Sequence, residues 1–460
     1  MSSLSIKRLK LHDYRCFSEI EIDFHEQLTV LVASNGAGKT SILDAIAVAL
    51  GPFVGAFDEG TGKRFEASDI RLSRVRKTAS NEMEYAPDGV WLEAIGHIGG
   101  SAGPKGSSTI SAITWQRSLA GPVKATTVKD AKPLIDFGKA LQHAVRRSDP
   151  DVALPLLAYY GTGRLWQQRK LRLSRLPRTS RTIGYGNCLN PSSSYKSMVE
   201  WFRYWSTNAL NGRISASEAK KTYKPTEFDD YIESVSTAVN VCLAPAGWKQ
   251  IAYSLAREEL VARHSKLGEL PVELLSDGIR NMIGMVADIA FRATKLNPQL
   301  GAQAAKRTSG IVLIDEVDMH LHPEWQQIVL QNLTKAFPKL QFIVSTHSPQ
   351  VLSAVHRDSI RVVGPDATGR LIAERPLAMT YGEPSGSVLH SVMMVDPQPP
   401  VAEKNELQRL TELIDQGRYE DRETKRLYTN LLAKLGDAHP QLQRLIRSIR
   451  RQEALSVSSA

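Results

Sequence analysis

The stretch LTVLVASNGAGKTSILDAIAVAL, Leu28–Leu50, decides the fold of this chain. An apolar run, Leu28–Val32, leads into small and polar residues and then into a second apolar run, Ile42–Leu50, so the stretch predicts a strand, a loop and a helix in that order. The backbone N–H groups of such a loop and the N-terminus of the following helix converge on one point, where they bind phosphate. The stretch therefore predicts a phosphate-binding loop.

The side chains of this loop are of the types that a nucleoside triphosphate requires. Lys39 would neutralise the β- and γ-phosphate oxygens, and the hydroxyl of Thr40 would ligate Mg²⁺. The other residues predicted to hold the nucleotide are the neighbours of these two in the loop: Asn35, Gly36, Ala37, Gly38 and Ser41. Loops of this type usually begin with Gly, and this chain has Ala33 there. A methyl group is tolerated where the backbone angles are ordinary.

A second motif, IVLIDE at Ile311–Glu316, complements the loop. It reads as a buried apolar strand that ends in two carboxylates. Asp315 would bind Mg²⁺, and Glu316 would polarise the water that attacks the γ-phosphate. The two motifs together predict a site for ATP and Mg²⁺.

Two further motifs lie on either side of this strand in the sequence. Leu275-Ser276-Asp277-Gly278 directly precedes the helical pattern Ile279–Phe291, and Phe342–Pro349 reads as an apolar strand with a polar end that contains His347. Taken alone, the tetrapeptide is an ordinary helix cap and a histidine at a strand end is usually structural. Their order relative to the other two motifs favours a functional role for both.

In this order the four motifs resemble those of ABC-type ATPases. The tetrapeptide is similar to the LSxG signature, and His347 is similar to the switch histidine of that superfamily. The resemblance implies that Ser276 and Gly278 contact the γ-phosphate bound to a second subunit, so that two heads dimerise around two ATP molecules. It also implies that His347 contacts the γ-phosphate or the attacking water.

Longer segments resemble narrower families. The run DEVDMHLHP at Asp315–Pro323 is similar to the RecF, OLD and SMC-like ATPases, and its place corresponds to the D-loop at the head interface. His320, His322 and Glu324 also offer zinc-ligand types, although interface contacts are the favoured interpretation. LLAYYGTGRLW at Leu156–Trp166 and STHSPQ at Ser345–Gln350 look like the PtuA-type ATPases of Septu and retron-associated anti-phage defence.

The defence resemblance implies partners outside this chain. A separate effector, such as an HNH nuclease, would be controlled by this subunit, and a retron reverse transcriptase with its DNA is a further candidate partner. The chain itself shows no nuclease motif. Two alternatives stay open: an ATPase of DNA repair or recombination, and a nucleotide-bound scaffold with negligible turnover.

The expected fold class is α/β, an ABC-type (SMC-like) P-loop ATPase head with a helical insertion and a C-terminal helical tail. The expected parts are a first half of the head at 1–116, a mostly helical insertion at 117–247, a second half at 248–396 and a tail at 397–460. The insertion sustains no heptad repeat, which argues against long coiled-coil arms.

A basic tract lies within the insertion, and the whole chain carries a net charge of +10. Between Val152 and Glu200 the acidic residues are absent. The basic residues of the tract are Arg164, Arg169, Lys170, Arg172, Arg175, Arg178, Arg181 and Lys196. Such a tract can bind nucleic-acid phosphates, form a solvated linker or dock an acidic partner. Arg164 stands apart, because the glycine-rich turn beside it suits the nucleotide or the head interface.

The remaining features indicate a cytoplasmic protein that does not cross a membrane. No continuous apolar stretch reaches the length of a membrane span, and the first residues lack a signal-peptide core. Cys16, Cys188 and Cys242 are too scattered for a zinc site or a disulfide framework. In the tail, helical patterns at Glu403–Ile414, Arg422–Leu435 and Leu442–Gln452 have apolar faces that need a partner, either the head, another copy of the chain or a partner subunit.

Overall fold

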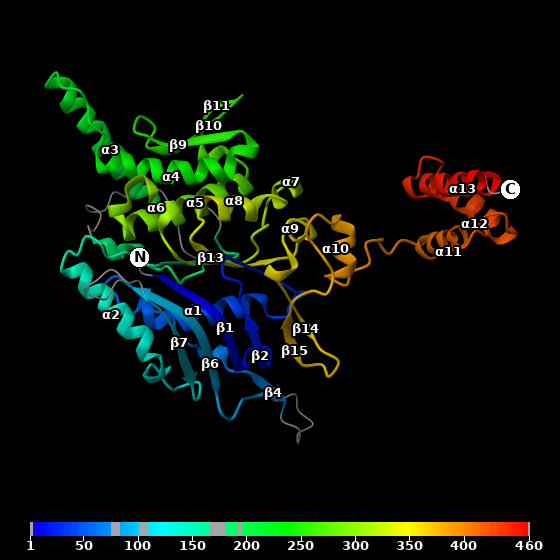
Figure 1. Cartoon of the computed structure of the whole chain (residues 1–460), viewed down its shortest axis with the longest axis horizontal. Coiled ribbons are helices and arrows are strands. Elements are labelled where there is room, and N and C mark those ends of the chain that lie inside the picture. The colour runs from blue at the N-terminus through cyan, green and yellow to red at the C-terminus, as the bar shows by residue number, and fades with distance from the viewer. Residues whose placement is uncertain (1–2, 75–82, 101–108, 165–179, 192–195, 459–460) are drawn as a thin grey trace. The chain divides into compact units, whose positions relative to one another are not determined.

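The computed structural model describes residues 3–74, 83–100, 109–164, 180–191 and 196–458. It forms two compact units, Met1–Met393 and Met394–Ala460, which correspond to a head and a tail. The head contains a six-stranded and a four-stranded sheet, two smaller sheets of three and two strands, and helices around them (Figure 1).

The strands of the head are β1 (Ser3–Tyr14), β2 (Phe17–Asp23), β3 (Leu28–Val32), β4 (Leu72–Arg74), β5 (Met83–Tyr85), β6 (Val90–Gly100), β7 (Thr109–Leu119), β8 (Leu156–Tyr160), β9 (Trp248–Ser254), β10 (Glu259–His264), β11 (Gly268–Pro271), β12 (Gly310–Ile314), β13 (Leu340–Thr346), β14 (Ile360–Pro365) and β15 (Leu371–Glu374). Its α-helices are α1 (Lys39–Val54), α2 (Lys132–Arg146), α3 (Lys196–Glu218), α4 (Glu227–Leu243), α5 (Asp277–Leu296), α6 (Ala304–Arg307), α7 (Pro323–Gln326), α8 (Val329–Ala336), α9 (Pro349–Ser353) and α10 (Ser385–Ser391).

The central sheet has the strand order β15-β14-β3-β13-β12-β8. All its neighbouring strands run parallel except β15, which pairs antiparallel with β14. Every residue of β12 and β13 is buried. Strands that are covered on both faces carry continuous apolar runs rather than alternating ones, which explains the sequences of Ile311–Ile314 and Phe342–Val344.

Helix α1 lies between the central sheet and a second, antiparallel sheet of order β2-β1-β6-β7 (Figure 1). Nearly all its residues are buried, because it packs on both sheets and on α2. On α2, Gly138 makes the close approach possible, since a Cβ there would lie 2.8 Å from the Cβ of Ala56. The phosphate loop is thus anchored by a helix whose residues from Ile42 to Val54 are all buried.

The other face of the central sheet is covered by α5 and α8, with α4 packed on both of these helices. Phe337, at the end of α8, contacts Phe342 of β13 at a ring-centroid distance of 6.4 Å. The three-stranded sheet β11-β10-β9 packs on α4. The helix expected at Ile279–Phe291 is α5, which extends to Leu296.

Strand β8 differs from the expected organisation. It lies inside segment 117–247, which the sequence predicts to be a mostly helical insertion, yet it pairs with β12 and forms an edge of the central sheet. Its five residues are all buried. The apolar run is typical of a strand, but periodicity does not show which sheet a strand joins, and this accounts for the difference.

The tail unit contains α11 (Lys404–Asp415), α12 (Arg422–Leu435) and α13 (Pro440–Ser458), close to the three helical patterns of the sequence. The apolar faces of the helices meet in a core of their own, formed by Leu407, Leu410, Ile414, Leu431, Leu442 and Leu445. These faces are therefore covered by one another.

The fold class predicted from the sequence is confirmed: a P-loop α/β head with further helices and a helical tail. Among the described residues, no helix is long and apolar enough to span a membrane.

Candidate nucleotide site

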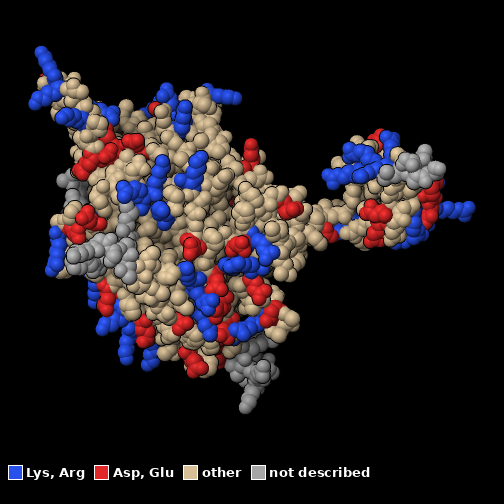
Figure 2. Space-filling view, in the orientation of Figure 1, with Lys and Arg blue, Asp and Glu red and all other residues tan. Residues whose placement is uncertain are grey.

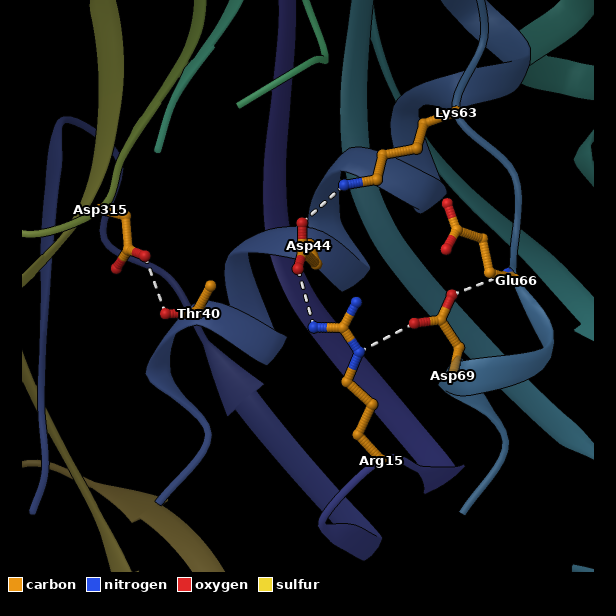
Figure 3. Close-up of polar contacts among 7 residues, drawn as sticks. All are labelled: Arg15, Thr40, Asp44, Lys63, Glu66, Asp69 and Asp315. Carbon is orange, nitrogen blue, oxygen red and sulfur yellow. Dashed lines mark hydrogen bonds and ion pairs between the residues drawn. The ribbon is translucent and has the colours of Figure 1, made fainter. Parts of the chain in front are cut away.

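The central sheet brings the predicted phosphate loop and carboxylates together at one edge. Strands β3, β13 and β12 are parallel neighbours, so their carboxyl ends lie side by side, where ligands bind in open α/β sheets. The hydroxyl of Thr40, in the first turn of α1, donates a hydrogen bond to Oδ2 of Asp315 at 2.7 Å (Figure 3). A hydroxyl and a carboxylate in contact are the oxygen ligands that Mg²⁺ prefers, so the residues present fit this ion.

The loop itself has the backbone that close approach to phosphate requires. Gly36 and Gly38 have φ angles of +78° and +94°, which residues with side chains rarely adopt. At Gly38 a Cβ would also lie 2.4 Å from the ring of Phe17. Ala33, at the position where Gly is usual, has a negative φ, so its methyl group introduces no backbone strain. Asn35 and Gly36 are exposed.

Lys39 is buried at the base of the loop. Its ammonium donates hydrogen bonds to the backbone oxygens of Ala33 at 3.0 Å and Ser34 at 3.3 Å. Burial lowers the pKa of Lys39 from its ordinary value, while the carboxylates of Asp315 and Glu316 act in the opposite direction. The ammonium group of Lys39 is thus held by the loop carbonyls, and both carboxylates favour its charged form.

Ser345 is a site residue that the sequence reasoning missed. Its hydroxyl donates to Oδ1 of Asp315 at 2.5 Å and accepts a hydrogen bond from the backbone N–H of Glu316 at 2.8 Å. Both oxygens of Asp315 are therefore held, one by Ser345 and the other by Thr40. A signal was present, because Ser345 is a polar residue inside an apolar strand.

Arg164 fixes the backbone of the two carboxylate residues. Its buried guanidinium donates to the carbonyl oxygen of Asp315 at 2.5 Å, to that of Glu316 at 2.6 Å and to that of Gly161 at 3.0 Å. Glu316 needs such support, because its φ of 49° is uncommon for a residue with a side chain. The arginine that follows β8 therefore holds the segment that follows β12.

The predicted switch histidine, His347, directly follows β13 and is half-buried. The residues beside it are fixed by hydrogen bonds. Thr346 Oγ1 donates to Oδ1 of Asp318 at 2.5 Å, and the hydroxyl of Ser348 accepts from the N–H groups of Gln350 and Val351 at the start of α9. The structure thus places His347 directly after β13. This strand is the neighbour of β12, which leads into Asp315 and Glu316.

The signature tetrapeptide begins α5. Ser276 is the exposed N-cap residue, and its side chain makes no capping hydrogen bond within the described part of the chain. Gly278 is buried, and a Cβ there would lie 2.3 Å from the backbone oxygen of His320. The glycine therefore permits close packing against the segment after Glu316 in the same chain, a role that the sequence resemblance did not anticipate.

One histidine of the His-Leu-His-Pro run, His322, has a local structural role. His322 caps α7 by accepting the N–H of Glu324 at 3.4 Å, and His320 has a φ of 62°. Among the described residues, no group of three or more His, Cys, Asp or Glu side chains could hold a metal ion.

A second network ties α1 to the turn after β1 (Figure 3). Arg15 donates to Asp44 of α1 at 2.7 Å and to Asp69 at 2.8 Å, and Lys63 donates to the other oxygen of Asp44 at 2.5 Å. Asp69 also accepts the N–H of Glu66 at 2.9 Å. No sequence motif predicts that these residues contact one another. Their network holds the helix that carries Lys39 and Thr40.

The structure describes two guanidinium groups of the basic tract, and both point inward. Arg164 binds the backbone below the carboxylates, as described above, and Arg181 donates to the carbonyl oxygens of Val152 at 2.9 Å and Leu296 at 2.7 Å. For Arg181 the structure corrects the assignment to a nucleic-acid contact, because its donors serve the fold. Arg164, which the sequence sets apart for the nucleotide or the head interface, binds backbone oxygens of its own chain beside the predicted nucleotide site. Residues 165–179, which include Arg169 to Arg178, and the side chain of Lys196 lie outside the description.

A family model described as an AAA domain matches residues 8–237. The chain belongs to the AAA-domain family. A second model, described as an AAA domain, putative AbiEii toxin, Type IV TA system, matches residues 254–353. The two matches contain the phosphate loop and the Asp315-Glu316 strand respectively.

Relatives of this AAA-domain chain occur among retron and Septu proteins. It is 23% identical to the Retron Vc95 probable ATPase of Vibrio cholerae, over 93% of this chain and 86% of that protein. The Retron Ec83 probable ATPase of Escherichia coli is 24% identical over 78% of this chain and 71% of its own length. The Septu protein PtuA of Bacillus thuringiensis is 30% identical over 28% of this chain and 33% of its length. The resemblance to PtuA-type ATPases is confirmed.

Solved structures similar to this AAA-domain chain include heads of SMC proteins. The Smc head domain with an extended coiled coil from Pyrococcus furiosus has a TM-score of 0.45 and 15% identity, covering 81% of this chain and 96% of that one. The SMC head domain from Thermotoga maritima has a TM-score of 0.38 and 14% identity, covering 81% and 99% respectively.

Proposed function

We propose that this chain binds ATP with Mg²⁺ and hydrolyses it. The observation that supports the proposal best is the contact of Thr40 with Asp315, with Glu316 directly after Asp315 and Lys39 directly before Thr40. Bound Mg²⁺ would neutralise charge on the phosphates and orient them. Thr40 and Asp315 would hold this ion, and Lys39 would exchange its loop carbonyls for phosphate oxygens.

In this proposal Glu316 accepts the proton of the attacking water. Arg164 and Ser345 fix the backbone on either side of Glu316, which limits the positions that its carboxylate can take. A positioned general base contributes about 10²- to 10⁴-fold to a rate. His347, at the end of the neighbouring strand, would contact the γ-phosphate or the water.

The proposal includes a dimer of heads around two nucleotides. Ser276 supports it, because this hydroxyl is exposed at the N-terminus of α5, where the helix dipole favours an anion. Gly278, two residues after Ser276, lies in the first turn of the same helix. Ser276 and Gly278 would thus complete the site of the partner head.

The proposed biological role is that of a regulatory ATPase in anti-phage defence, as the names of the retron and Septu relatives suggest. The chain would control a separate effector, such as an HNH nuclease, with a retron reverse transcriptase and its DNA as further partners. An ATPase of DNA repair or recombination is the second candidate, and a scaffold with negligible turnover is the third.

The turnover of purified protein tests the chemistry. With Glu316→Gln we expect ATP to bind as before while hydrolysis falls about 10²- to 10⁴-fold, and with Lys39→Ala we expect binding to be lost. Equal rates for Glu316→Gln and the parent would exclude Glu316 as the base. Undetectable turnover in the parent, with tight ATP binding, would favour the scaffold.

The defence role is tested in cells that carry the chain with its neighbouring genes. We expect cells that carry the parent chain to reduce phage plating. Cells that carry the Lys39→Ala variant should lose this protection. Deletion of an adjacent nuclease gene should also abolish protection. Unchanged plating with the parent, combined with sensitivity of the Lys39→Ala strain to DNA damage, would favour the repair role.

A further inference from the structure

Helix α13 of the tail carries a row of arginines on one face. Arg444, Arg447, Arg450 and Arg451 are all exposed. At 100° per residue these four positions fall within about 120° of the helix circumference and span about 10 Å of its axis. Figure 2 shows Lys and Arg side chains gathered on this part of the tail. We call these four residues the α13 arginine face.

These arginines differ from the other cations of the tail, most of which are paired. The ion pairs of the tail join Lys404 to Asp396, Arg409 to Glu412 and Glu423, Arg418 to Asp421, Lys425 to Glu420, and Lys434 to Glu403 and Glu406. No ion pair found among the described residues includes a member of the α13 arginine face. Four exposed positive charges therefore lie close together, and no ion pair found among the described residues neutralises them.

The apolar side of α13 is already in use. Leu442, Leu445 and Ile449 lie on the opposite side of the helix and pack into the tail core with α11 and α12. A helix that lies on a membrane inserts its apolar side into the lipid. With that side covered, α13 does not fit a membrane surface.

The described surface of helices α11, α12 and α13 also lacks the anchors of a stable protein interface. Such interfaces have an apolar core with buried aromatic or aliphatic residues and are depleted of charge at the centre. In the part of α11, α12 and α13 whose side chains the structure describes, no large hydrophobic residue is exposed. A flat, charged face without apolar anchors is instead suited to a phosphodiester backbone, whose binding rests on charge.

We propose that the α13 arginine face binds the phosphate backbone of nucleic acid. Guanidinium groups suit this ligand because each can donate two parallel hydrogen bonds to a phosphate. The contact involves the phosphates and not the bases, so binding does not depend on the sequence of the nucleic acid. It is separate from the basic tract of the head and does not depend on ATP hydrolysis.

A salt titration of DNA binding by the full-length chain tests the proposal. The variant carries Arg444→Gln, Arg447→Gln, Arg450→Gln and Arg451→Gln, and binding to a duplex and to a single strand of fixed length is measured by fluorescence anisotropy. We expect weaker binding, and a slope of log K against log salt that falls by up to about 3.6 units for four lost duplex contacts and about 2.8 for a single strand. ATP turnover should match that of the parent.

A matched control removes the same charge from the head. Lys129, Lys132, Lys139 and Arg147 are exposed on or beside α2, and changing all four to Gln lowers the net charge equally. We expect this control to keep most of the salt slope. A variant with Lys at the four positions of the α13 arginine face keeps the charge and should retain most of the binding.

Three results would overturn the proposal. One is an unchanged salt slope in the Gln variant, provided that this variant unfolds at the same temperature as the parent. Another is an equal loss of DNA binding in the head control, which would indicate attraction by net charge alone. The third is capture of an acidic protein through these arginines by a chain that binds no DNA. If the Gln variant unfolds, the same salt titration is applied to two milder variants, Arg444→Gln with Arg447→Gln and Arg450→Gln with Arg451→Gln, and an unchanged slope in both folded variants counts as the first of these results.

Discussion

The backbone oxygen of His320 faces Gly278 so closely that a Cβ on Gly278 would lie 2.3 Å from it. Gly278, in the first turn of the signature helix, is thereby packed against the segment that follows Asp315 and Glu316. A displacement of one of these segments must be accommodated by the other, so we expect the signature of one head and its own Asp315-Glu316 segment to move together.

Gly278→Ala tests this packing. The added methyl group would force the backbone of His320 away, at a cost of about 1–3 kcal/mol in the free energy of unfolding. We also expect slower ATP turnover, because the shifted segment begins at Glu316. Urea unfolding and steady-state turnover measure the two effects. Gly364→Ala is the control, since a Cβ at Gly364 meets nothing within 4 Å and the φ there is ordinary. Equal behaviour of the two variants would contradict the expectation.

Ser276→Arg tests the completion of the site by a second head. The side chain of Ser276 is exposed, so the substitution should leave the fold and ATP binding intact. Placed in a Glu316→Gln background, it should block association on addition of ATP, because the arginine occupies the space of the partner's phosphate. Light scattering with and without ATP measures the association. A dimer that forms equally well with and without the Ser276→Arg substitution would rule out this arrangement.

Arg164→Lys tests whether Arg164 positions Glu316. A lysine keeps the charge but cannot span the carbonyl oxygens of Asp315 and Glu316 as the planar guanidinium does. We expect kcat to fall by about 10-fold or more, in line with a displaced general base, while KM changes little because Lys39 and Thr40 are untouched. Arg164→Gln should be worse in kcat and should also lose stability. A proportional rise in KM with unchanged kcat would assign Arg164 to nucleotide binding instead.

The buried pair of Asp288 and Arg292 on α5 should be important for stability. Arg292 donates to Asp288 at 2.8 Å, and the hydroxyl of Tyr160 donates to the same carboxylate oxygen at 2.7 Å. Arg292→Leu would leave a buried carboxylate without its cation, which costs about 3–5 kcal/mol. For the exposed pair of Arg375 and Asp358, Arg375→Leu should cost less than about 1 kcal/mol. Urea unfolding of both variants provides the comparison.

The parts of the site that the sequence predicts are those within local motifs. Lys39 and Thr40 follow from residue type and spacing, because the strand, loop and helix around them are contiguous in the chain. Asp315 follows from its place at the end of an apolar strand. Ser345 and Arg164 could not be predicted in their roles, because their contacts to Asp315 and Glu316 depend on which strands are neighbours in the sheet. Periodicity indicates that a strand is buried, but it does not give the strand order.

The same limit applies to the outer parts of the fold. The tail helices are amphipathic in the sequence, and only the structure shows that Leu410, Leu431 and Leu442 meet one another. For the basic tract, charge alone could not separate exposed cations from Arg181, whose guanidinium binds carbonyl oxygens. Nucleic-acid binding by Arg169 to Arg178 stays a prediction, since these residues lie outside the description.

The position of β8 at the edge of the sheet has a practical consequence for splitting the chain. Residues 147–151 form the first part of the segment between α2 and β8 and are exposed. A break there would leave Lys39 and Thr40 on one polypeptide, and Arg164, Asp315 and Glu316 on the other. Neither piece alone could turn over ATP, so recovery of hydrolysis on mixing would serve as an enzymatic reporter of fragment complementation.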